Sequence, residues 1–180
     1  MPIVTPRRIA VAATLALVSA CQDETVSPPR ESPVVNVPSG AVQALIQQES
    51  PTGDGLVTFV VRVFAKDLAV SSYQGTVTFA PGSFELVAKG TPAGATAVVN
   101  TDAFGQGRIR FAALTPTQFD SVSSGSGVEA FRFTVRTLRE LATANLVATL
   151  DVVGTDAGAS VGADRMLPSP GVMAAGRPDK

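Results

Sequence analysis

Apolar residues recur at every second position through the middle of this chain, from about residue 41 to residue 164. No stretch in this region keeps the spacing of three and four residues that marks a helix. The alternating segments are short, and clusters of Gly, Pro, Asp and Ser separate them, which is the pattern of strands joined by turns. The pattern predicts an all-β domain in which most strands bury one face and expose the other.

The predicted strands are short enough to form two packed sheets. They cover residues 42–48, 56–64, 73–79, 84–86, 95–101, 108–114, 128–137, 145–153 and 159–163. The segment 145–153 is apolar on nearly both faces and is predicted to lie inside a sheet, whereas 159–163 is predicted to close an edge. Eight or nine short strands without helices favour an antiparallel β-sandwich of the immunoglobulin or jelly-roll kind, with a closed barrel as the alternative.

The first twenty residues are typical of an export signal. A basic start ending at Arg7 and Arg8 precedes an apolar run over 9–20, which is too short for a bilayer core that takes about 20 residues. The sequence Val18-Ser19-Ala20-Cys21 resembles a bacterial lipobox, and Cys21 is the only cysteine of the chain. The resemblance implies cleavage before Cys21 and lipid attachment to it. The alternatives are an ordinary signal peptide with a chance cysteine and a cytoplasmic protein with an apolar first helix.

The segments on either side of the predicted sandwich lack periodicity. Residues 21–40 contain four prolines, which exclude a helix or a central strand and favour an extended tether. Residues 165–180 are rich in Pro, Gly and Ala and are predicted to be a disordered tail. The domain plan is therefore a signal peptide (1–20), a lipidated tether (21–40), a sandwich (41–164) and a tail. It predicts a protein held by lipid at the bacterial cell envelope, on its periplasmic or extracellular side.

Composition disfavours most catalytic mechanisms. The chain has no His, which is the commonest general base and a frequent metal ligand. Its formal charge is -1, and this balance disfavours nucleic-acid binding, which needs clustered positive charge. No spacing of carboxylates requires a bound metal, including Ca²⁺ near Asp102 or Asp151. The composition therefore predicts a protein that is not an enzyme and that uses no cofactor or metal.

Three blocks of the predicted sandwich resemble the cohesin domain when they are taken in order. The blocks are Tyr73-Gln74-Gly75-Thr76-Val77-Thr78-Phe79-Ala80-Pro81 with Phe84-Glu85-Leu86-Val87, then Gly107-Arg108-Ile109-Arg110-Phe111-Ala112-Ala113, then Val128-Glu129-Ala130-Phe131-Arg132-Phe133-Thr134-Val135. Ala80 is a departure, because cohesins usually carry Asp before the turn proline. The resemblance implies a nine-stranded jelly roll, related to carbohydrate-binding modules, that docks a calcium-loaded dockerin.

The candidate ligand-facing residues are one aromatic and four basic side chains. They are Tyr73, Arg108, Arg110, Arg132 and Arg136. The arginines occupy outward positions of two predicted strands, where they either belong to a solvated sheet face or, if those strands adjoin, form one basic patch for a protein or an anionic glycan. The leading hypothesis is a protein-interaction module with a dockerin-like partner. The alternative is a polysaccharide-binding module, although the chain has no Trp and a single Tyr on which a sugar ring would stack.

Overall fold

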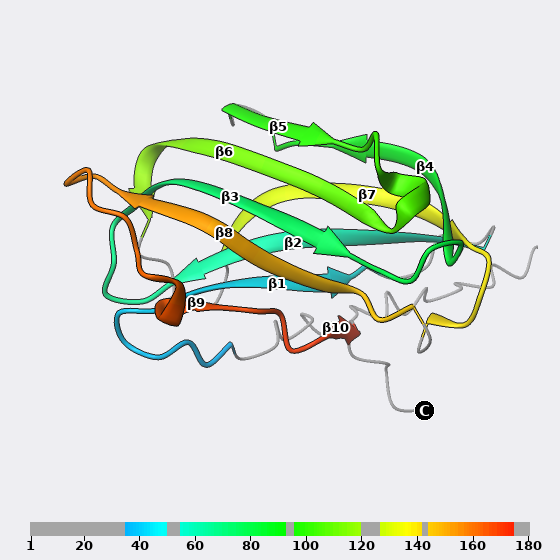
Figure 1. Ribbon diagram of the computed structural model, residues 1–180, viewed down its shortest axis with the longest axis horizontal. Helices are drawn as coiled ribbons and strands as arrows, with labels where there is room; N and C mark the ends of the chain where they lie inside the picture. Colours follow the sequence, from blue (N-terminus) through cyan, green and yellow to red (C-terminus); the bar gives the residue numbers. More distant parts are fainter. Residues whose placement is uncertain (1–34, 50–54, 93–95, 120–126, 142–143, 175–180) are drawn as a thin grey trace, which may run out of the picture.

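A computed structural model describes residues 35–49, 55–92, 96–119, 127–141 and 144–174. Two β-sheets lie one over the other in this part of the chain (Figure 1). The predicted signal peptide, the lipobox with Cys21 and most of the predicted tether lie outside the described residues. The strands are β1 (Val42–Gln48), β2 (Leu56–Ala65), β3 (Val70–Thr78), β4 (Phe84–Gly90), β5 (Thr96–Asn100), β6 (Arg108–Phe119), β7 (Val128–Thr137), β8 (Val147–Thr155), β9 (Met166–Leu167) and β10 (Val172–Ala174). The 3₁₀ turns are η1 (Phe104–Gln106) and η4 (Ala163–Arg165).

The two sheets confirm the predicted β-sandwich. One sheet has the strand order β10-β1-β2-β7-β4, with β9 also paired to β1, and is called the six-stranded sheet below. The other has the order β5-β6-β3-β8 and is called the four-stranded sheet. Strands within each sheet pair antiparallel, except that β9 and β10 run parallel to β1. The chain therefore forms a sandwich and not the alternative barrel.

The main core lies between the sheets and is built by the alternation seen in the sequence. Phe59 of β2 and Phe133 of β7 are buried, with ring centroids 5.3 Å apart. Phe111 of β6 reaches the same layer and lies 5.2 Å from Phe131. Gly75 of β3 leaves room for this packing, because an added Cβ would lie 2.4 Å from the Phe111 ring. Aromatic and β-branched side chains from both sheets thus fill one continuous interior.

Two predictions about strand position are wrong. The segment 145–153 contributes β8, which is an outer strand of the four-stranded sheet and not an interior one. Leu146, Leu150 and Val153 of this segment face the core. Val152 is 45% exposed on the outer face. The predicted closing strand 159–163 is a single bridge between Gly154 and Ser160.

The ends of the predicted domain are also wrong, because the folded unit extends beyond 41–164 on both sides. Met166 and Leu167 pair with the start of β1, and β10 pairs with its end, so 166–174 is not a disordered tail. Val35 and Val37 belong to the predicted tether, yet they are buried. They form a second core with four residues of the domain: Ala41, Leu45, Phe64 and Leu167.

This second core lies on the outer side of the six-stranded sheet. Leu45 and Phe64 occupy outward positions of β1 and β2, since their neighbours Ala44 and Val63 face the main core. Residues 35–41 therefore cover part of the outer side of the six-stranded sheet. The outer side of the four-stranded sheet is the opposite surface of the molecule.

Candidate functional site

Tyr73 is a core residue, so its predicted role as a ligand-facing side chain is wrong. It points inward from β3 and is 2% exposed. Its ring meets Phe111 edge to face, at 6.4 Å between centroids. Burial raises the pKa of its hydroxyl to about 12. The sequence carried a signal for this position, because Tyr73 is four residues before Val77 and therefore has the same inward phase.

The four arginines do not form one basic patch, which corrects that prediction. Arg108 and Arg110 lie on β6 in the four-stranded sheet, whereas Arg132 and Arg136 lie on β7 in the six-stranded sheet. All four point outward, as their alternation predicts. The outer faces of the two sheets look in opposite directions, so the two pairs of arginines are on opposite sides of the molecule.

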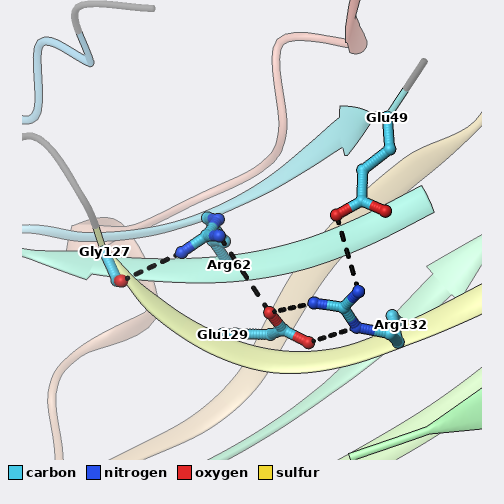
Figure 2. Close-up of polar contacts among 5 residues, drawn as sticks. All are labelled: Glu49, Arg62, Gly127, Glu129 and Arg132. Atoms are coloured by element: carbon cyan, nitrogen blue, oxygen red, sulfur yellow. Dashed lines mark hydrogen bonds and ion pairs between the residues drawn. The ribbon is translucent and has the colours of Figure 1, made fainter. Parts of the chain in front are cut away.

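Arg132 and Arg136 are occupied by ion pairs on the six-stranded sheet. Figure 2 shows Arg132 donating from Nε and Nη2 to the two carboxylate oxygens of Glu129, each at 2.8 Å. Arg132 also lies 3.6 Å from Glu49, and Arg62 lies 4.0 Å from Glu129. The hydrogen bond to Glu129 is the main cause that raises the pKa of Arg132. Arg136 pairs with Glu85 at 2.7 Å.

The outer face of the four-stranded sheet has an apolar end. Pairing in register places Val98 of β5 beside Ala112 of β6, then Gln74 of β3 and Val152 of β8. Leu114 follows Ala112 by two residues on the same face. Val98 is 69% exposed and Leu114 is 61% exposed. Three of the five large hydrophobic residues that are exposed in the described chain are Val98, Leu114 and Val152, so the apolar surface is concentrated on this face.

A β-bulge in β8 contributes to this surface. Val152 pairs with Gln74 and Leu150 pairs with Gly75, so Asp151 is an extra residue between them. Both Asp151 and Val152 are consequently exposed, which strict alternation would not allow. The hydroxyl of Thr76 donates to the Asp151 carboxylate at 2.9 Å. The bulge thus places a carboxylate next to an exposed valine on one strand.

The same face has a polar end, at the start of β6. Arg108 and Arg110 line a hollow of about 200 Å³ together with Asn100, Asp102 and Ala103. The Asn100 amide donates to the Asp102 carboxylate at 3.2 Å, and the Asp102 backbone N–H donates to Asn100 Oδ1 at 2.9 Å. Among the ion pairs of the described residues, none includes Arg108 or Arg110.

The two ends form one surface. A hollow of about 260 Å³ lies over the apolar end, between Val98, Leu114 and Val152. A neighbouring hollow of about 200 Å³ is lined by both Val98 and Arg110 and so connects the ends. A larger hollow, of about 550 Å³, lies elsewhere, near Gln48, Asn145 and Ser169, and no titratable side chain lines it. We therefore take the outer face of the four-stranded sheet as the candidate site.

The chemistry of this face suits binding. Its side chains are aliphatic, hydroxyl, amide, guanidinium and carboxylate groups. Within the described ranges, no group of three or more His, Cys, Asp or Glu residues is placed to hold a metal ion. No helix among those residues is long and apolar enough to cross a membrane.

Comparison with solved structures identifies the fold as cohesin-like. A type I cohesin–dockerin complex from Clostridium thermocellum matches with a TM-score of 0.50 and 8% identity, over 74% of this chain and 99% of that one. A cohesin module from a Clostridium perfringens family 33 glycoside hydrolase matches with a TM-score of 0.47 and 12% identity, over 74% and 98% of the two chains. No protein-family profile matches this sequence, and no curated protein does.

Proposed function

We propose that this protein is a non-catalytic module that binds a protein partner through the outer face of its four-stranded sheet. The observation that carries the proposal is the cluster of exposed aliphatic side chains at Val98, Leu114 and Val152. Fully burying one such side chain contributes about 1.5–3 kcal/mol relative to leaving it in water. A protein surface that covers the three together would gain several kcal/mol, which would offset part of the free-energy cost of association.

The cohesin-like fold supports a dockerin-like domain as the partner. The matched complex from Clostridium thermocellum pairs a cohesin with a dockerin. The opposite side of the molecule supports the same choice of face, because the second core and the ion pairs of Glu129 already occupy the six-stranded sheet. We extend the proposal to anchoring by lipid on Cys21 at the bacterial envelope, which the sequence Val18-Ser19-Ala20-Cys21 supports.

No observation favours the polysaccharide-binding alternative. Sugar rings commonly stack on exposed aromatic side chains. The exposed large hydrophobic residues of the described chain are all Val or Leu. Polysaccharide binding therefore stays an untested prediction, and protein binding is the function that this surface supports best.

Site-specific photo-crosslinking in the producing organism tests the proposal. The full-length protein would carry p-benzoylphenylalanine in place of Val98 or, as the matched control, in place of Val87. Val87 is also an exposed valine on a strand, 48% exposed, but it lies on β4 of the six-stranded sheet. We expect a covalent adduct with one protein from position 98 and not from position 87. The proposal fails if position 98 gives no adduct, or if both positions give the same one.

A further inference from the structure

We infer that the partner presents a carboxylate to Arg108 and Arg110. This carboxylate lies next to an apolar patch of the partner, which packs on Val98, Ala112 and Leu114. This inference rests on the proposed function and specifies the chemistry of the partner at the same face. It follows from the charges at the polar end and from their fixed distance to the apolar end.

Arg108 and Arg110 are exposed, and neither belongs to an ion pair of the described residues. Both are exposed and point to the same side of β6, with Cα atoms about 7 Å apart because residues two apart on a strand share a face. By contrast, Arg132 and Arg136 on the other sheet each have a carboxylate within 2.8 Å. No described carboxylate lies within 4.0 Å of Arg108 or Arg110. A guanidinium binds a carboxylate through two parallel N–H donors, so two adjacent ones suit an acidic side chain.

The two acidic residues of this face, Asp102 and Asp151, form no ion pair with Arg108 or Arg110. Asp102 lines the hollow with the two arginines, and its carboxylate accepts a hydrogen bond from Asn100. The hollow therefore holds two positive charges and one negative charge. Asp151 lies on β8, two strands from β6, and lines the connecting hollow together with Arg110, but the ion pairs of the described residues do not join the two. The face is thus positive over β6 and negative over β8, which favours one orientation of an asymmetric partner.

Strand geometry fixes where the partner's carboxylate must lie. Arg110 is two residues from Ala112 and four from Leu114, so the Arg110 Cα lies about 7 Å and about 14 Å from theirs along β6. Val98 and Arg110 line one common hollow. A partner that covers the apolar end would therefore reach Arg110 with an Asp or Glu located about 7–14 Å from its apolar contact residues.

The test uses the full chain with p-benzoylphenylalanine at position 98 and adds a charge reversal. Arg110→Glu changes the candidate residue, and Arg136→Glu makes the same charge change at an exposed arginine of the other sheet. Thermal unfolding of both variants checks the fold, and Arg110→Gln provides a second variant that removes the charge without reversing it. We expect Arg110→Glu to lower the yield of the adduct about tenfold or more, and Arg136→Glu to change it less than twofold.

Salt and peptide mapping complete the test. Raising NaCl from about 0.05 M to about 0.5 M should lower the yield of the adduct from position 98 when both arginines are present, because salt screens exposed charge pairs. The cross-linked peptide of the partner should contain Asp or Glu near its apolar residues. The inference is overturned, while the proposed function stands, if Arg110→Glu and Arg110→Gln capture the partner as well as the wild type. A non-acidic contact peptide, or an adduct between two copies of this chain, also overturns it. If the wild-type face captures nothing, both proposals fail.

Discussion

Raising the pH tests the packing of the core through a single residue. Tyr73 is the only tyrosine and the chain has no Trp, so one hydroxyl reports on the buried layer. Its pKa is raised by burial from 10.0 to about 12, whereas the unfolded chain keeps the ordinary value. The folded state therefore favours the neutral phenol. The stability that this preference contributes is fully present below pH 10 and is lost as the pH rises from about 10 to about 12. A pKa that is higher by about two in the folded state than in the unfolded state corresponds to about 3 kcal/mol in the free energy of unfolding.

Two measurements check this expectation. Ultraviolet absorbance of the tyrosinate should show that the folded protein ionises near pH 12 and the urea-unfolded protein near pH 10. Urea unfolding at several pH values should show the loss of stability in the wild type and a smaller loss in Tyr73→Phe. The comparison removes the contribution of the lysines, because they titrate in both proteins. The argument is refuted if the hydroxyl of the folded protein ionises near pH 10, or if both proteins lose stability equally.

Three further substitutions test the second core, the close packing between the sheets and the anchor. Phe64→Ala should cost about 3–5 kcal/mol in urea unfolding, because Phe64 is fully buried beside Val37; a cost below about 1 kcal/mol would mean that Val37 does not cover it. Gly75→Ala should cost about 1–3 kcal/mol or more, because the added Cβ would lie 2.4 Å from the Phe111 ring and from the Thr149 carbonyl oxygen. Gly105→Ala is its control, since no atom lies within 4 Å of the added Cβ, and equal effects would contradict the packing argument. Cys21→Ser should move the protein from the membrane fraction to the soluble fraction in immunoblots, and continued retention would contradict lipidation.

Local alternation was sufficient to predict most of the strands. Strands β1 and β7 have the predicted bounds 42–48 and 128–137, because the inward and outward phases of a strand depend only on residues two apart. Strands β9 and β10 are two and three residues long, which is too short for any periodicity to appear. They are fixed by pairing with β1, and a residue's own neighbours in sequence carry no information about that partner. Phe64 did carry a signal for the second core, since a large aromatic at an outward position of a strand requires a cover.

The error over the four arginines shows why alternation alone is insufficient to locate a site. Alternation assigns a side chain to the inner or outer face of its own strand, and it did so correctly for Arg108, Arg110, Arg132 and Arg136. It does not say which sheet the strand joins. Strands β6 and β7 follow each other in the chain but belong to different sheets, as crossing connections of sandwiches allow. Outward residues of the two strands therefore point in opposite directions. Arg108 and Arg110 belong to the candidate site because β5, β6 and β8 bring exposed aliphatic residues to the same face. A charge reversal at Arg110 and another at Arg136 therefore test whether binding depends on the sheet that carries the arginine.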